Sequence, residues 1–296
     1  MYPQESIVSS NSFQAKRNAF RLSIVLNAGL SSLQIVIGIT FGSIALIGDA
    51  IHNFGDVIGL LMGWGAESLS HRAPTRRFSY GLGRSTQMAA VANAVLILMA
   101  SAVLCVESFQ RFGNPVPLVT GPIAWAAVAG LIVNLGSAKL FGDHDHDLNR
   151  KSAVIHLLSD AAVSAAVLLS TLLVRATDWQ WLDPLTGLLV GCSIGWMGIG
   201  LLEKALAETM DAIPDYIDTD KVKSTLEKLQ GVQSIHHLHI WPLSTSRVAL
   251  TAHIVQSLSL SEADHNLITT ASKKMYTLGI HHCTFQVESA DNSCYN

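Results

Sequence analysis

Two pairs of histidine and aspartate share a spacing that suits a metal ion. His52 and Asp56 are four residues apart in GDAIHNFGDV, and His156 and Asp160 repeat that spacing in HLLSD. Residues four apart in a helix lie on one face, one turn from each other. Two such pairs that faced each other would offer two imidazoles and two carboxylates. This donor set suits tetrahedral Zn²⁺.

Both pairs lie inside long apolar segments, where a charged group is costly. An aspartate at the centre of a bilayer costs at least about 2.5–3.5 kcal/mol, so four such groups need a compensating partner. A hydrogen-bonded pair between helices, or a proton relay without metal, would also explain one His–Asp pair. The repeated spacing favours the metal. Asp49 lies one turn before His52 but about 60° off its stripe, so we assign it to support of the ligands or to the ion's path.

The elements that carry these residues indicate a membrane protein. The chain has 296 residues, of which 49% are hydrophobic and 14% charged, against about 25% charged in soluble domains. Segments of roughly 20 apolar residues are long enough to cross a bilayer. Six such segments are predicted: 19–41, 44–68, 86–111, 119–141, 152–175 and 184–206.

The distribution of Lys and Arg orients these spans. Eleven basic residues flank the side that holds both termini, and two, Arg111 and Arg175, lie on the other side. The positive-inside rule therefore places both termini in the cytoplasm, with the protein in the cell (inner) membrane. We divide the chain into a flexible cytoplasmic N-terminus (1–17), a six-helix transmembrane domain (18–208), a cytoplasmic metal-binding and dimerisation domain (209–290) and a tail (291–296).

The C-terminal region has the pattern of a small α+β domain. Seven of the twelve histidines follow Asp211, and this part carries the whole net charge of −3. An acidic domain without a basic stripe argues against nucleic-acid binding. The predicted order is αββαβ, with helices at 218–230 and 261–278, strands at 235–241, 247–255 and 281–288, and a hairpin link PLSTS between the first two strands.

One short polar loop, FGDHDHDLNR, separates the fourth and fifth spans. His144, His146 and the neighbouring aspartates would gather cations weakly, or they form an ordinary solvated loop; the sequence leaves both open. The four cysteines show no CxxC spacing and imply no disulfide framework.

The motifs taken in order resemble the cation diffusion facilitator family, in its zinc-transporter-like branch. The resemblance covers about residues 18–290. It rests on GSIALIGDAIHNFGDV, RAPTRRFSYGLGR, HLLSDAAVS, DPLTGLLVG, IHHLHIWPLS, ALTAHIV and HHCTFQVE. It implies a homodimer of six-helix protomers in the lipid bilayer, each with a ferredoxin-like (αββαβ) cytoplasmic domain. Its implied activity is export of a divalent metal in exchange for protons.

The resemblance also implies two metal sites. The transport site would be His52, Asp56, His156 and Asp160, and a histidine at position 52 favours zinc over manganese or iron. Cytoplasmic zinc ligands would be His236, His253, His281 and Glu288, with His239 as a neighbouring candidate, and zinc there would stabilise the dimer and sense cytoplasmic metal. Arg76 and Tyr80 occupy the positions of a further metal site found in some relatives, so no such site is expected.

Two other functions would also suit metal-binding residues inside a membrane. An intramembrane metal-dependent hydrolase would need an open ligand position and a general base, typically in HExxH. The sequence has no such motif, so we expect no enzyme. A metal sensor that does not transport would bind metal without flux.

Overall fold

The computed structural model describes residues 24–141, 148–256 and 263–289. It divides into two compact units, one of residues 1–61 and 93–200, the other of residues 62–92 and 201–296. The predicted cation-gathering loop with His144 and His146 lies outside the described residues.

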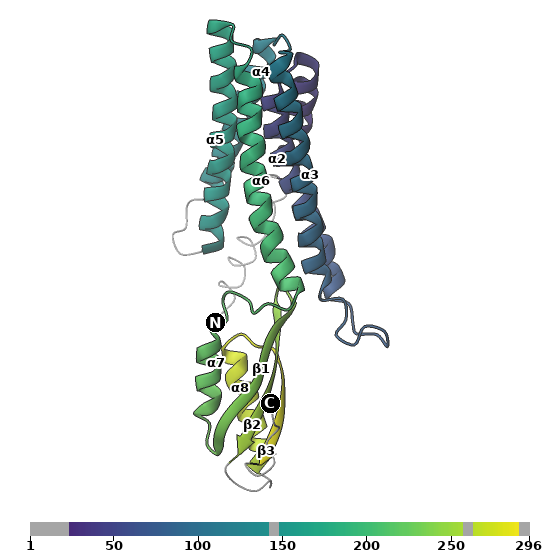
Figure 1. The fold of residues 1–296 in the computed structure, drawn as a ribbon, viewed down its shortest axis with the longest axis vertical. Coiled ribbons are helices and arrows are strands. Elements are labelled where there is room, and N and C mark those ends of the chain that lie inside the picture. Colours follow the sequence, from purple (N-terminus) through teal and green to yellow (C-terminus); the bar gives the residue numbers. More distant parts are fainter. Residues whose placement is uncertain (1–23, 142–147, 257–262, 290–296) are drawn as a thin grey trace, which may run out of the picture. The chain divides into compact units, whose positions relative to one another are not determined.

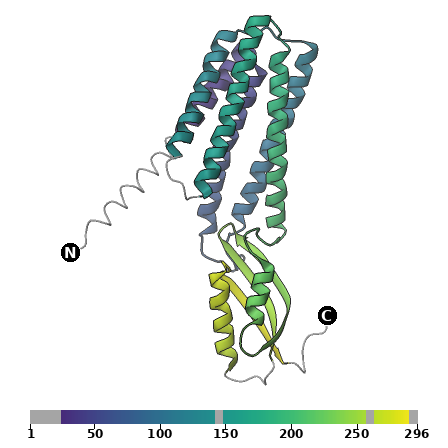
Figure 2. The same cartoon turned by 90° about the vertical axis from the view of Figure 1, so that its left-hand side faces the viewer.

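Six helices are long and apolar enough to cross a membrane, which confirms the six predicted spans. They are Ile24–Phe41, α2 (Ile44–Ser70), α3 (Ser85–Gly113), α4 (Thr120–Phe141), α5 (Leu148–Thr177) and α6 (Leu182–Thr209). The start of the first span lies outside the described residues, and every other predicted boundary falls within four residues of the observed one. Within the first unit the helices run side by side as a bundle (Figures 1 and 2).

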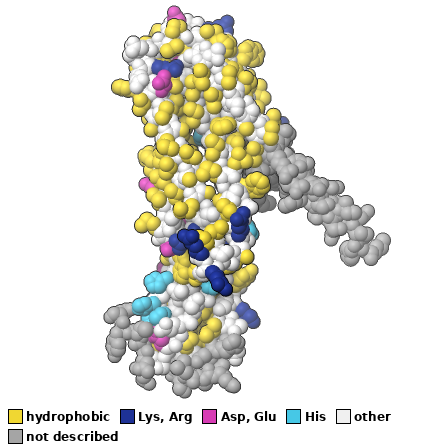
Figure 3. All heavy atoms as spheres, turned by 90° about the vertical axis from the view of Figure 1, so that its right-hand side faces the viewer, with side chains coloured by type: hydrophobic (Ala, Val, Ile, Leu, Met, Phe, Trp, Pro, Cys, Tyr) yellow, Lys and Arg dark blue, Asp and Glu magenta, His cyan; other side chains and the backbone are white. Residues whose placement is uncertain are grey.

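The outside of the helical bundle is apolar. Val36 (60% exposed), Val103 (69%) and Trp196 (81%) project from three different helices, and hydrophobic side chains cover much of the helical surface (Figure 3). A protein in water rarely exposes so large an apolar area. The chain is therefore an integral membrane protein whose helices face lipid.

Small residues let the helices of the bundle approach closely. A Cβ added at Gly48 would lie 2.8 Å from Leu104, and one at Gly191 would lie 2.7 Å from the Cys105 sulfur. Close backbone approach supplies the van der Waals packing that holds membrane helices together. These contacts fix α2 and α6 against α3.

The turn before α2 is held from a distant part of the chain. Gly42 has φ +83, which suits glycine. Ser43 Oγ donates to Asp183 Oδ1 (2.5 Å), and the Ile44 N–H donates to Asp183 Oδ2 (2.8 Å). Asp183, at the start of α6, thus satisfies a free N–H at the start of α2 and complements its dipole.

Beyond the ends of α2, α3 and α6, the second unit contains a three-stranded sheet and two helices. Its elements are α7 (Thr219–Glu227), β1 (Val232–Ser244), β2 (Arg247–Gln256), α8 (Ala263–Thr277) and β3 (His282–Ser289). This confirms the predicted αββαβ order. The strand order is β1-β2-β3, with β1 antiparallel and β3 parallel to β2.

The β1–β2 hairpin is tighter than predicted. The strands pair through Pro242 with Val248 and Ser244 with Arg247, which leaves Thr245 and Ser246 as the turn instead of the five-residue link. Pro242 cannot donate to a ladder, and it is tolerated here because β1 lies at the sheet's edge.

Both helices of this unit pack on one face of the sheet (Figure 1). Val222 and Leu226 of α7 and Met275 of α8 join Ile254 and Leu250 of β2 in one buried cluster. Because side chains alternate along a strand, the residues between these point to the opposite face. That face carries the histidines of β1 and β2.

Candidate metal centres

The four predicted ligands in the membrane lie together, paired crosswise between α2 and α5. His52 Nε2 lies 3.1 Å from Asp160 Oδ1, and His156 Nε2 lies 3.2 Å from Asp56 Oδ2. His156 Nε2 is also 3.8 Å from Asp160 Oδ2. The ring centroids of the two histidines are 6.0 Å apart. Each histidine therefore faces the carboxylate of the other helix.

These separations match those expected between ligands of one zinc ion. Zn–N and Zn–O bonds of roughly 2.0–2.2 Å at tetrahedral angles put neighbouring ligand atoms about 3.3 Å apart. One ligand atom each from His52, Asp56 and Asp160 falls within 4.8 Å of the others. The site can thus take a divalent ion with small side-chain movements.

The four predicted ligands differ in exposure. The side chains of His52 and Asp160 are 9% and 4% exposed, while those of His156 and Asp56 are 46% and 32% exposed. An arriving ion would therefore meet the exposed pair, His156 and Asp56, before the buried pair, His52 and Asp160. The arrangement suits an ion that enters and leaves from one side at a time.

Asp49 forms a hydrogen-bonded support next to this site. It is fully buried, and its Oδ2 accepts from Ser164 Oγ (2.9 Å) and Gln34 Nε2 (3.2 Å). Asn53 Nδ2 donates to the Asp49 backbone carbonyl (3.0 Å). Asp49 thereby links α2 to α5 and to the first helix, and it does not belong to the group of ligand atoms. Of the two roles left open for it, support of the ligands agrees with these contacts.

Sequence reasoning missed two residues that hold the ligand helices. Ser164 is four residues beyond Asp160, so the i, i+4 spacing that revealed the ligands also points to it. Asp183 had no such signal, because its partners Ser43 and Ile44 are about 140 positions away.

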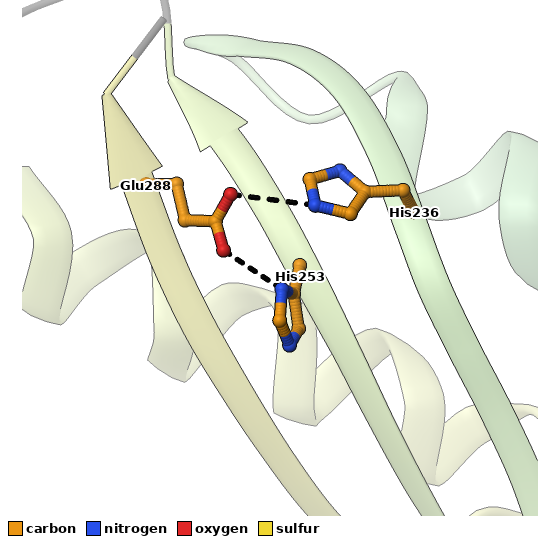
Figure 4. A group of neighbouring side chains, drawn as sticks. All are labelled: His236, His253 and Glu288. Atoms are coloured by element: carbon orange, nitrogen blue, oxygen red, sulfur yellow. Dashed lines mark ion pairs between the residues drawn. The ribbon is translucent and has the colours of Figure 1, made fainter. Parts of the chain in front are cut away.

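A second group of potential ligand atoms lies on the face of the sheet opposite to α7 and α8. His253 Nδ1 is 2.7 Å from Glu288 Oε1, and His236 Nε2 is 3.3 Å from Glu288 Oε2 (Figure 4). The three residues come from three strands. His236 pairs with His253 in the β1–β2 register, and Glu288 is next to Val255 in the β2–β3 register.

The contacts in this group suit a shared cation better than hydrogen bonds. Neither His236 Nε2 nor His253 Nδ1 has hydrogen-bond geometry to any described residue, although both are buried and close to Glu288. The carboxylate itself is only 5% exposed and accepts from Gln286 Nε2 (2.8 Å). Buried nitrogen atoms aimed at a buried carboxylate without donating to it fit zinc ligands.

His281 and His239 lie apart from this group. His281 precedes Glu288 by seven residues, about 23 Å along an extended strand, and its ring contacts Tyr276. His239 does not belong to the described group of His236, His253 and Glu288, whose ligand atoms lie within 4.8 Å of one another. Within one described chain, the expected ligand set thus separates into His236, His253 and Glu288 on one side and His281 on the other.

Comparison with known proteins identifies the family. Residues 20–208 match the family described as the cation efflux transmembrane domain, and residues 214–290 match the cation efflux protein, cytoplasmic domain. The chain belongs to the cation efflux family. This confirms the resemblance to the cation diffusion facilitators, and it makes the protein a metal-cation transporter and not a hydrolase.

Three relatives share most of their length with this chain. The zinc transporter ZitB of Escherichia coli is 30% identical over 95% of this chain and 90% of its own. A Bacillus subtilis protein called cadmium, cobalt and zinc/H⁺–K⁺ antiporter is 29% identical over 93% and 90%. The metal cation efflux system protein CzcD of Cupriavidus metallidurans is 27% identical over 92% and 86%.

Proposed function

We propose that this cation efflux protein exports Zn²⁺ in exchange for protons, with His52, Asp56, His156 and Asp160 as the transport site. The observation that carries this is the crosswise pairing of two HxxxD motifs between two membrane-spanning helices. Four neutral or anionic donors at zinc-like spacing, inside a bundle that faces lipid, have a transported dication as their simplest explanation.

Proton exchange follows from the chemistry of the ligands. Zn²⁺ requires neutral imidazoles and ionised carboxylates, so binding from the cytoplasm releases protons. When the site opens to a proton-rich exterior, the imidazoles take up protons and the affinity for zinc falls. Export thus draws on the proton gradient.

The number of protons decides whether the membrane potential also contributes. Exchange of Zn²⁺ for two protons moves no net charge, whereas exchange for one proton moves one charge. Each charge moved is worth about 2.3 kcal/mol per 100 mV. Flux measured at zero pH gradient with an imposed potential separates these two stoichiometries.

Zinc is the proposed substrate because of the ligand set. Two imidazoles and two carboxylates suit zinc, and ZitB of Escherichia coli is named a zinc transporter. The name of the Bacillus subtilis relative adds cadmium and cobalt, which use similar sites. We expect His52→Asp to lower the preference for Zn²⁺ over Cd²⁺; an unchanged ratio of the two fluxes would contradict the role given to His52.

The cytoplasmic domain is proposed to bind zinc at His236, His253 and Glu288. Bound metal there would stabilise a homodimer and report the cytoplasmic zinc level, separately from transport. The excess of Lys and Arg on one side of the helices supports a cytoplasmic location for both termini in the cell membrane.

The decisive experiment is zinc flux in proteoliposomes, with and without a pH gradient, at a clamped potential. Wild type should transport faster with protons concentrated on the side opposite to the zinc. Asp160→Ala should show background flux under both conditions. Equal initial rates for wild type with and without the gradient would remove the proton coupling, and metal binding without flux would leave a sensor in place of a transporter.

A further inference from the structure

Strand β1 contains an irregularity in the middle of its histidine cluster. His236 pairs with His253, but His239 pairs with Thr251, so three steps along β1 correspond to two along β2. One extra residue is therefore inserted in β1 between these positions, which is the definition of a β-bulge. His237 has φ +48, a left-handed conformation that a non-glycine residue rarely adopts.

The bulge changes the direction of the His237 side chain. Consecutive residues of a regular strand point to opposite faces of the sheet. Here the His237 ring is stacked on that of His253, with centroids 4.9 Å apart and planes 18° apart, and it is 5.3 Å from the ring of His236. The inserted residue thus brings three imidazoles together, two of which lie beside Glu288.

The ligand group needs one more donor than its three strands supply. His236, His253 and Glu288 bring their ligand atoms within 4.8 Å of one another. A structural zinc ion takes four protein ligands, and His281 is at the far end of β3. His237 is exposed, and its ring already lies beside those of His236 and His253.

We propose that His237 is the fourth ligand of the cytoplasmic zinc ion, delivered to it by the bulge in β1. The inference rests on the proposed cytoplasmic zinc site and names a residue that the family resemblance did not. Strained backbone persists where the surroundings hold it for a purpose. In this case the strain places an imidazole that a regular strand would direct to the other face.

Zinc affinity of the full-length protein in detergent tests the assignment. The background is Asp56→Ala with Asp160→Ala, which disables the transport site, and zinc is competed against a chromophoric chelator. His237→Ala should weaken zinc binding at least tenfold. His282→Ala, a histidine whose ring contacts Tyr80, is the matched control and should leave the affinity within twofold.

Two further measurements distinguish a ligand from a residue with only a structural role. Co²⁺ in place of zinc should give the intense visible bands of a tetrahedral site, and His237→Ala should weaken them. His237→Gly removes the backbone strain, so it should raise the melting temperature of the metal-free protein while lowering zinc affinity.

The outcomes distinguish the proposed role of His237 from the existence of the cytoplasmic zinc site. Unchanged zinc affinity in His237→Ala overturns it, and so does an equal loss in His237→Ala and His239→Ala, which would indicate a general effect on β1. Unchanged affinity in His253→Ala as well would remove the cytoplasmic zinc site itself. Zinc flux, measured in the chain with an intact transport site, tests the exporter independently of both.

Discussion

The two groups of proposed metal ligands are built on different supports. In the membrane, two ligands come from α2 and two from α5, and the groups meet side chain to side chain. In the cytoplasmic domain, the ligands come from three strands joined by a backbone ladder. A helix can tilt without loss of its internal hydrogen bonds, whereas a strand cannot shift without breaking bonds to its neighbour.

This difference indicates that the membrane site can change its geometry, whereas the sheet site keeps its ligands at fixed positions. A pair of helices that meet through side chains can open and close a site around an ion. A sheet in fixed register keeps its ligands at constant spacing, which suits an ion that stays bound. We therefore expect mutations in the first group to change flux and mutations in the second to change metal content.

The largest effect should come from the buried carboxylate of the first group. Asp160→Asn keeps the shape but removes the negative charge that a dication requires, so zinc flux in proteoliposomes should fall at least a hundredfold. Asp178→Asn, in the exposed turn after α5, is the matched control and should transport normally. Near-normal flux in Asp160→Asn would mean that this carboxylate does not hold the ion.

A smaller effect should come from the support next to the ligands. Ser164→Ala removes the 2.9 Å hydrogen bond to Asp49, and loss of a residue that orients ligands typically lowers metal affinity about 10- to 100-fold. Calorimetric zinc titration measures this loss of affinity. Ser170→Ala is the control, because Ser170 is a buried serine of the same helix whose hydroxyl has no partner among the described residues. Equal losses in both variants would count against a specific role for Asp49.

A still smaller effect on flux is expected from the sheet. His253→Ala should remove about one zinc ion per chain from the purified protein, measured by elemental analysis, and lower flux only a few-fold. If flux disappeared together with the bound zinc, the sheet site would be part of the transport path, and the contrast between the two regions would fail.

The smallest effect on zinc flux or zinc binding should come from changes at Cys283 on β3. Burial raises the pKa of its thiol from 9.0 to about 11, because the charged thiolate loses hydration. The neutral form thus stabilises the folded domain below about pH 9, and that contribution is lost as the pH rises towards 11. Alkylation by iodoacetamide, in a variant with the other cysteines replaced, should be slow at pH 7 and accelerate up to about pH 11. Rapid reaction at pH 7 in the folded protein would contradict this.

The elements could be predicted from sequence because each leaves a local pattern. Six long apolar runs and one αββαβ alternation specify helices and strands with little help from distant residues. The spacing of His52 and Asp56 indicated a shared helix face. It did not reveal that His52 pairs with Asp160, because this pairing depends on how α2 is rotated against α5.

The details of the sheet could not be predicted, for a similar reason. HHLHIW is compatible with more than one strand register, and only the pairing of His239 with Thr251 reveals the inserted residue. The family resemblance implied that His281 and Glu288 bind the same ion. In an extended strand, however, a separation of seven residues holds them far apart. Long-range register, and not residue type, decides which of the seven C-terminal histidines meet.

The hydrogen bonds from Ser43 and Ile44 to Asp183 hold the first turn of α2, and a movement of the helix about this anchor would have to carry Asp49 and its contacts with Ser164 and Gln34. His52 is eight residues from Ile44, about 12 Å along the helix axis. A swing of about 10° around this pivot carries the imidazole about 2 Å, the length of a zinc–nitrogen bond. A change in helix angle of this size would therefore be enough to break a zinc–nitrogen bond at the proposed transport site.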